Sequence, residues 1–599
     1  MSDSKNDSFE KSRKVAARRW FQIFSFLISL SSLLLVVYEV GFPNPQVTFH
    51  TFKNFYFAAL VLFLLFTIGR YVFFFPKKQR KGVWFFDLIF VSSIIILIIK
   101  KMFYDDTSDA FLLFFEHRLW IYFLIVYYFF KELSLLGLSL VSRHFNPALV
   151  FVISFLMLII SGTLLLLLPN ATTNGISIMD SLFTSTSAVC VTGLTVVDTE
   201  FCFTFFGKII ILCLIQAGGL GIMTFTSYFS YFFKGKPTFY SQLMLSDMAN
   251  SESFAELFIV LRRIILVTIL IEAAGALLIF FQIPSSVGMS SGDMIFFSVF
   301  HSVSAFCNAG FSTLSDNFHD INFRFNYPVH LIISFLIIFG GLGFPIIFNF
   351  LKYFKHLFVN RIFRLNKRRE FIHKAWVINT NTRIVTITTF VLLVVGTIVF
   401  LILEYHNTLS EHQGIGKLVT SFFSIVSPRT AGFNSINYGL LHVSTILFII
   451  LLMWIGASPA STGGGIKTTS FALSLLTIFS LAKGKDRVEV FGRQVADSSL
   501  RRTSAIIFLS FIIIGISIFC VSFFDSEKNL LDIVFECFSA YGTVGLSLGI
   551  TPQLSEASKL ILTITMFLGR LGTLTVLIAF FKKIHLSNYH YPIENILIN

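Results

Sequence analysis

The chain of 599 residues is 55% hydrophobic and only 13% charged, with a mean hydropathy of +0.80. Because soluble domains carry about 25% charged residues, this composition indicates an integral membrane protein and excludes a soluble enzyme. The formal net charge of +14 does not indicate a nucleic-acid partner, because the lysines and arginines gather in a few short loops between apolar segments, as in the positive-inside pattern.

The N-terminal part contains four apolar segments of roughly 17–25 residues, the length that crosses a bilayer. They begin near Phe21, Phe55, Val83 and Leu119. The first is too long for the apolar region of a signal peptide, so we interpret it as a retained span. Residues 1–140 are therefore expected to form an N-terminal extension with about four transmembrane helices, whose default role is peripheral packing or lipid contact.

Eight further apolar segments pair around four related segments, each of which carries a glycine. These apolar segments lie near residues 146–169, 204–233, 258–282, 327–351, 384–404, 441–483 (interrupted), 503–524 and 557–581. The pattern predicts an all-α polytopic membrane protein with four pseudo-fourfold repeats of span, pore helix, filter loop and span around a central pore. The expected pore repeats are 146–235, 256–356, 384–485 (with a broken second span) and 503–583, followed by a cytoplasmic tail, 584–599.

The glycine segments are the expected cation site. A short amphipathic stretch rich in Ser and Thr precedes each of them and is too short and polar to span the membrane. Short helices entering from outside would direct their negative C-terminal ends towards the membrane centre, which favours a cation there. Glycine permits positive φ, and non-helical backbone at that depth must line a cavity. The predicted K⁺ filter, built from backbone only, comprises Val191, Thr192, Gly193, Asn308, Ala309, Gly310, Thr430, Ala431, Gly432, Thr543, Val544 and Gly545.

A second repeated feature follows each glycine segment. Residues 216–221, 340–345 and 569–572 are rich in small residues, which in the first two cases we interpret as close helix packing. In the third repeat a proline and a glycine triplet would break the helix inside the membrane, which predicts a gate below the filter. The predicted gate residues are Gly456, Pro459, Gly463, Gly464, Gly465, Lys467 and Arg570.

Two charged residues in apolar surroundings allow more than one interpretation. Arg570 lies inside a span, where a charge is costly and usually faces an aqueous cavity or a partner. It either raises a barrier to cations below the filter or forms a structural ion pair, for which Glu272 is the candidate. Glu536, in the fourth short helix, is expected to pair or cap, without a role in transport.

The distribution of charge predicts the orientation. With twelve alternating spans, almost all basic loops, the longest running from Lys352 to Arg383, fall on one side. Both termini are therefore expected in the cytoplasm. The opposite side carries Asp198, Asp293 and Asp316 among other acids, so the outer mouth would attract cations.

The six cysteines and thirteen histidines do not suggest catalysis. The cysteines show no Cys-x-x-Cys spacing, so neither a disulfide framework nor a metal-ligand set follows, and those beside the glycine segments are expected to be packing residues. The histidines are scattered and unpaired. No catalytic residue, enzyme activity or cofactor is therefore expected. The cysteines are Cys190, Cys202, Cys213, Cys307, Cys520 and Cys537.

These motifs resemble the Trk/Ktr/HKT superfamily of potassium transporters, and in particular a bacterial TrkH-like membrane subunit. The resemblance covers about residues 146 to 599. It is carried by Val-Thr-Gly-Leu at 191–194, Gln-Ala-Gly-Gly-Leu-Gly at 216–221, Asn-Ala-Gly-Phe at 308–311, Thr-Ala-Gly-Phe at 430–433, Gly-Gly-Gly-Ile-Lys-Thr at 463–468, Gly-Arg-Leu-Gly at 569–572 and the C-terminal residues 591–598.

The resemblance implies a K⁺ site of backbone carbonyls at the four glycines, a gating loop near residues 463–467 and a functional Arg570. It also implies a homodimer in the bacterial cytoplasmic (inner) membrane, in contact with lipid, on a cytosolic nucleotide-binding regulatory subunit of the TrkA/KtrA type. Serine in place of the first filter glycine is associated with sodium preference in this family, so Gly193 favours potassium. The N-terminal extension departs from the family pattern.

The expected function is gated, channel-like uptake of K⁺ across the cytoplasmic membrane. The alternative is a symporter that couples cation entry to H⁺ or Na⁺. A four-repeat voltage-gated channel would need six spans per repeat and a sensor helix with regularly spaced arginines, and neither is present. An organic-substrate transporter would need inverted repeats, whereas the four repeats here are parallel.

Overall fold

The computed structural model describes residues 2–42, 49–74, 81–103, 115, 117–141, 147–221, 254–365 and 378–581. Helices dominate these residues, with one short hairpin of β1 (Glu489–Val490) and β2 (Arg493–Gln494). Parts of the predicted basic loops, at 77–80, 143, 234–236 and 366–377, lie outside the described residues, as does the predicted tail 584–599.

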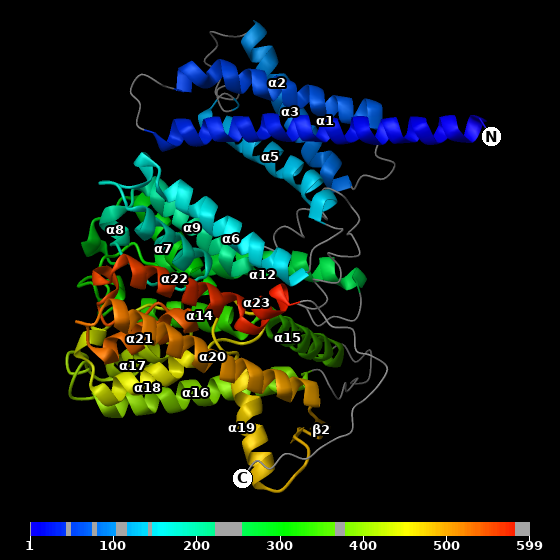
Figure 1. Cartoon of the computed structure of the whole chain (residues 1–599). Helices are drawn as coiled ribbons and strands as arrows, with labels where there is room; N and C mark the ends of the chain where they lie inside the picture. Colours follow the sequence, from blue (N-terminus) through cyan, green and yellow to red (C-terminus); the bar gives the residue numbers. More distant parts are fainter. Residues whose placement is uncertain are drawn as a thin grey trace.

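The N-terminal helices form a bundle of their own, at the top of Figure 1. The bundle comprises α1 (Ser2–Gly41), α2 (Phe49–Phe74), α3 (Lys81–Phe103) and α5 (Arg118–Val141). Its core holds stacked aromatic rings and two ion pairs, Lys131–Asp87 and Arg70–Glu132. The Asn170 amide joins it to the remaining helices by donating to the Val40 carbonyl at 2.9 Å.

The remaining helices repeat one order four times: a long helix, a short helix and a second apolar helix. We call these sets units one to four. They are α6 (Pro147–Leu166), α7 (Ile178–Val189) and α9 (Phe205–Leu220); α12 (Phe254–Phe280), α13 (Ser291–Cys307) and α14 (Tyr327–Leu342); α16 (Thr380–Glu404), α17 (Ile415–Val426) and α18 (Val443–Trp454); α20 (Asp497–Phe524), α21 (Leu530–Gly542) and α22 (Glu556–Leu571).

Further helices are α15 (Phe344–Leu365), α19 (Thr468–Ala482), α23 (Thr573–Phe580) and the single turn α8 (Thr199–Cys202). Short 3₁₀ turns lie in the connections: η1 (Pro169–Ala171), η2 (Ser285–Val287), η3 (Asn317–His319), η4 (Tyr438–Leu440) and η5 (Thr551–Gln553).

Local sequence explains where two of the short helices begin. Ser177 and Ser290 cap α7 and α13 by accepting the backbone N–H of the residue three positions on, and each serine hydroxyl also bonds that aspartate's carboxylate. This Ser-x-x-Asp arrangement resembles a capping box, which satisfies the free N–H groups of a first turn. Both helices therefore start at a fixed residue and present their C-terminal ends to the glycine segments.

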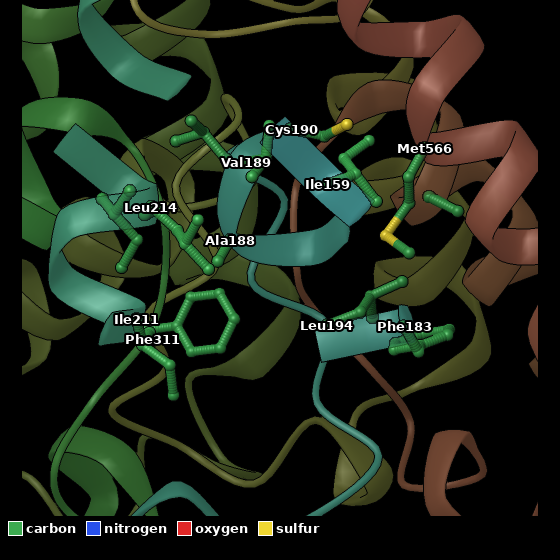
Figure 2. Close-up of a cluster of buried hydrophobic side chains, with 14 of the residues drawn as sticks. Ile159, Phe183, Ala188, Val189, Cys190, Leu194, Ile211, Leu214, Phe311 and Met566 are labelled. Atoms are coloured by element: carbon green, nitrogen blue, oxygen red, sulfur yellow. The ribbon is translucent and has the colours of Figure 1, made fainter. Parts of the chain in front are cut away.

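Each short helix packs against the second helix of the preceding unit. Thus α13 contacts α9, α17 contacts α14 and α21 contacts α18, while α7 of unit one contacts α22 of unit four. The contacts therefore close into a ring. Figure 2 shows the apolar packing at one part of it, where Val189 of α7 lies between Leu214 of α9 and Met566 of α22, all in one buried cluster.

The second helices of the units are shorter than expected. Among the described residues, six helices are long and apolar enough to cross a membrane, or up to eight if each bent pair counts as one span. The continuous spans predicted at 327–351 and 557–581 are wrong, because the chain turns by 102° between α14 and α15 and by 90° between α22 and α23. Helix α9 ends at Leu220, and the rest of the span predicted at 204–233 lies outside the described residues.

Glycines account for both the breaks and the close packing. Gly221, Gly343 and Gly572 follow the last residues of α9, α14 and α22, with φ of 76°, 84° and 79°, a region that side chains disfavour. Earlier in the same motifs, a Cβ on Gly218 or Gly340 would lie closer than 3.0 Å to a carbonyl oxygen of a short helix. The small residues thus bring second and short helices together, and the last glycine ends the helix.

Candidate ion-binding site

The four predicted glycines are adjacent in space and form a closed ring. A Cβ built on Gly193 would lie closer than 3.0 Å to the carbonyl oxygen of Ala309, the residue before Gly310. The same relationship links Gly310 to the Ala431 carbonyl, Gly432 to the Val544 carbonyl and Gly545 to the Thr192 carbonyl. Units one to four therefore follow one another around the ring, with unit one opposite unit three and unit two opposite unit four.

The backbone of the four glycine segments (191–193, 308–310, 430–432 and 543–545) has one shared conformation. The glycines have φ of 90°, 70°, 80° and 91°. The second residue before each glycine also has positive φ, although none of these residues is glycine: Val191 56°, Asn308 61°, Thr430 70° and Thr543 50°. Positive φ costs about 1–3 kcal/mol for a non-glycine residue and persists only where the surroundings impose it. Its recurrence at one position in all four units indicates a built backbone geometry.

The carbonyl oxygens between these positions are available to a ligand. In the part of the chain that the structure describes, none of the carbonyl oxygens of Thr192, Ala309, Ala431 and Val544 accepts a hydrogen bond. Their residues are fully buried, and an unpaired buried carbonyl is costly unless something binds it. Rings of backbone carbonyl oxygens are the ligand type that replaces the hydration shell of a cation, so these four oxygens are the candidate ion-binding site.

A serine in each short helix, or in unit three directly after it, fixes the glycine segment. Ser187 and Ser539 accept the backbone N–H of Gly193 and Gly545, at 3.0 and 3.1 Å. In the other two units the serine donates to the carbonyl of the residue after the glycine: Ser304 to Phe311, at 2.7 Å, and Ser427 to Phe433. The sequence shows the signal, a serine five or six residues before each glycine, but only as part of a general Ser/Thr enrichment.

A polar cavity of about 410 Å³ lies on one side of the ring; we call it the outer cavity, following the orientation predicted from the sequence. All four glycines line it, together with the acids Asp198 and Asp316 and the imidazole of His319. Burial, and then Arg324, lower the pKa of His319 from its ordinary value of 6.5, which disfavours the charged imidazole. The net charge of the titratable lining is therefore negative, which attracts cations.

Beneath the ring lies the irregular stretch between α18 and α19, residues 455–467, which we call the inner loop. Its ends are joined, because Gly456 N–H donates to the Ile466 carbonyl at 2.8 Å. Gly463 and Gly464 lie against the side chains of Thr430 and Thr543, the positive-φ residues of units three and four. The loop therefore packs directly on two glycine segments from the inner side.

Other predicted gate residues support the same loop. Lys467 Nζ donates to the Gly463 carbonyl at 2.7 Å. Gly465 adopts a φ of 64°. A Cβ built on Gly343, where α14 ends, would lie closer than 3.0 Å to the Pro459 carbonyl oxygen. The predicted gate residues are thus close together at the inner side of the ring.

Arg570 ties the inner loop to unit one. One guanidinium nitrogen donates to the carbonyl of Thr462 in the loop, and the other to the Gly218 carbonyl at the end of α9, at 2.6 Å. Glu272 instead accepts from the Gln216 amide at 3.2 Å. Within the described residues, the structure shows no ion pair between Arg570 and Glu272, so that structural alternative from the sequence is wrong.

Comparison with known proteins gives a consistent assignment. A family model described as "TrkH: Cation transport protein" matches residues 123–590. The chain is 38% identical to the Ktr system potassium uptake protein B of Bacillus subtilis, over 75% of this chain and 96% of that protein. It is 33% identical to the potassium/sodium uptake protein NtpJ of Enterococcus hirae, over 76% and 98%.

A solved structure shares the fold. The potassium transporter TrkH from Vibrio parahaemolyticus matches with a TM-score of 0.58 at 17% identity, over 84% of this chain and 97% of that one. The chain belongs to the TrkH family of cation transport proteins, which confirms the resemblance noted from the sequence. Residues before 123 lie outside the family match.

Proposed function

We propose that this member of the TrkH family takes up K⁺ through a gated pore whose selectivity filter is the ring of glycine segments. The observation that carries the proposal is the closed ring of unpaired carbonyl oxygens from Thr192, Ala309, Ala431 and Val544. Units one to four then correspond to four pore repeats, at 146–235, 256–356, 384–485 and 503–583. The short helices are the pore helices, with their negative ends towards the ion.

The chemistry of the ring favours a monovalent cation over an anion or an organic substrate. Carbonyl dipoles replace the hydration shell of K⁺ without a formal charge, and none of the four carbonyl residues is acidic. Relatives that cover most of the chain are named as potassium uptake proteins. Their names and the glycine at position 193 support K⁺ as the transported ion.

The inner loop would act as the gate and Arg570 as an electrostatic barrier. The loop packs on the inner side of the ring. The Arg570 guanidinium is bonded to this loop, so its positive charge would repel a cation leaving the filter. Opening would need the loop to leave Thr430 and Thr543, and we expect a regulatory signal to drive this movement.

Assembly and orientation belong to the same proposal. We infer a homodimer in the bacterial cytoplasmic membrane, with cytoplasmic termini and a cytosolic nucleotide-binding subunit that controls the gate. The basic loops support this orientation, and the broken third unit offers a movable element for such a subunit to act on. The N-terminal bundle is expected to pack at the periphery and to contact lipid.

Growth of a K⁺-uptake-deficient bacterium at low K⁺ tests the function directly. We expect rescue by the full chain, with and without a co-expressed cytosolic subunit of a relative, and no rescue would contradict K⁺ uptake. Rubidium uptake into proteoliposomes distinguishes a channel mechanism from a symport mechanism. A channel lets rubidium tracer follow the membrane potential, worth about 2.3 kcal/mol per charge per 100 mV, whereas a symporter also accumulates tracer when only a Na⁺ or H⁺ gradient is imposed.

A further inference from the structure

Two polar side chains occupy the same position in opposite units and make the same kind of contact. His301 in α13 and Glu536 in α21 lie nine residues before Gly310 and Gly545, and both are fully buried. His301 Nε2 lies 2.9 Å from Ser312 Oγ, and Glu536 accepts a hydrogen bond from the Ser547 hydroxyl. These serines lie two residues after the two glycines, at the wall of the outer cavity.

The neighbouring groups fix the direction of the hydrogen bond between His301 and Ser312. His301 Nδ1 lies 2.9 Å from the carbonyl of Phe297, which can only accept, so Nδ1 carries the proton and Nε2 accepts from Ser312 in the neutral ring. Ser312 Oγ in turn accepts the N–H of Leu314 at 3.0 Å, and Ser547 Oγ accepts the N–H of Gly549 at 2.8 Å. Each serine therefore donates to its short helix and accepts from its own turn, which holds the segment beyond the glycine in one conformation.

Units one and three lack this connection. The position nine residues before the glycine is Thr184 in unit one, and its hydroxyl donates to the carbonyl of Asp180 in its own helix at 2.8 Å. In unit three it is Phe423, which has no hydrogen-bonding group. Among the described residues, the connection thus exists in units two and four alone, on opposite sides of the ring.

We propose that His301 and Glu536 are positioning residues that hold Ser312 and Ser547 at opposite sides of the outer entrance and thereby set the affinity for the entering cation. The inference rests on the proposed K⁺ function. Glu536 Oε2 also accepts a hydrogen bond from the Thr551 hydroxyl at 3.0 Å. The carboxylate therefore restrains the whole turn from Ser547 to the start of η5. A free turn would let the cavity wall move, and a cation would enter a site of variable shape.

The test is the KM and the maximal rate of rubidium uptake by the full chain, normalised to the amount of protein in the membrane. We expect Glu536→Leu and His301→Leu each to raise KM about tenfold, as expected for one lost hydrogen bond, with a much smaller change in maximal rate. Glu536→Gln keeps the size and an acceptor for Ser547, and it should stay near the wild-type KM. Thr184→Val is the matched control from unit one and should leave KM unchanged.

The more conservative substitutions Ser312→Ala and Ser547→Ala should reproduce the rise in KM. The double variant Ser547→Ala/Glu536→Leu should have the same KM as either single variant, because both substitutions remove the same contact. An unchanged KM in the serine variants overturns the proposal, even if the leucine variants fail to reach the membrane. An equal rise in Glu536→Gln would assign the effect to the lost negative charge and also overturns it. If the wild type takes up no rubidium, the proposed function fails. If the wild type takes up rubidium and the variants have the same KM, this inference alone fails.

Discussion

The backbone N–H of Gly464 donates a hydrogen bond to the hydroxyl of Thr543, 3.1 Å away. This contact joins the inner loop to the glycine segment of unit four, at the residue whose positive φ shapes that segment. The proposed gate and the proposed filter therefore share an atom-to-atom contact, and a change in one must alter the other.

Removing this contact should open the gate. Thr543→Val keeps the side-chain shape but leaves the Gly464 N–H without its acceptor, which costs about 1–3 kcal/mol when the group is buried. We expect several-fold higher basal rubidium flux in proteoliposomes without any cytosolic subunit. Thr420→Val is the matched control, because the Thr420 hydroxyl is buried in α17 without a partner in the described structure. A flux equal to wild type in Thr543→Val would contradict the assignment of the inner loop as gate.

The filter assignment is tested by two neighbouring glycines with nearly equal φ. Gly545 has φ of 91° and would place a Cβ closer than 3.0 Å to the Thr192 carbonyl, whereas Gly549 has φ of 95° with nothing within 4 Å. Alanine at either position adds backbone strain of about 1–2 kcal/mol, but only Gly545→Ala also displaces a filter carbonyl. We expect Gly545→Ala to lose K⁺ over Na⁺ selectivity and Gly549→Ala to keep it. Selectivity is measured by competition of Na⁺ with rubidium uptake. Equal selectivity in both variants would contradict the assignment of the ring as the selectivity filter.

The serines of the short helices should matter for selectivity as well. Ser187→Ala leaves the N–H of Gly193 unpaired in a buried position, with a cost of about 1–3 kcal/mol, and the glycine segment of unit one should become mobile. We expect weaker K⁺ over Na⁺ discrimination at a normal amount of protein in the membrane. Ser424→Ala, at a buried hydroxyl with no partner in the described part of the chain, is the control and should behave as wild type.

Much of this site could be predicted from the sequence, because its components are local. The glycines, the broken third unit and Arg570 each stand out in a short stretch of residues. The conformation of Val191 and Thr430 could not be predicted, since β-branched residues disfavour positive φ. Only the closed ring of neighbouring segments imposes that conformation, and the ring is a tertiary feature.

The helix bends at Gly343 and Gly572 and the hydrogen-bond partners of Arg570 could not be predicted from the sequence for a different reason. Hydropathy measures how apolar a segment is and carries no direction, so the continuous apolar stretches at 327–351 and 557–581 gave no sign of turns at Gly343 and Gly572. The partners of Arg570 are backbone carbonyls of Thr462 and Gly218. Every residue has a carbonyl, so a search for a charged partner selects Glu272 instead.

Replacing Arg570 separates the two roles considered for it. Arg570→Gln removes the positive charge and at least one of the two carbonyl contacts, so we expect a several-fold rise in basal flux. Because Glu272 bonds Gln216 and not Arg570, Glu272→Gln should not reproduce this effect. We expect the double variant to keep the raised basal flux of Arg570→Gln, because the two side chains share no hydrogen bond. Rescue of Arg570→Gln by Glu272→Gln would instead indicate a functional ion pair between them.

The outer cavity should respond to acid through His319. Burial and Arg324 lower the pKa of this imidazole below 6.5, so it gains its positive charge at a lower pH than an ordinary histidine. Because the folded protein disfavours the charged form, this group lowers stability as the pH falls, and its charge would repel cations at the entrance. We expect the KM for rubidium to stay constant from about pH 8 to about pH 6.5 and to rise towards pH 5. His319→Gln should flatten that rise, and a rise of equal size in the variant would assign the acid response to another group.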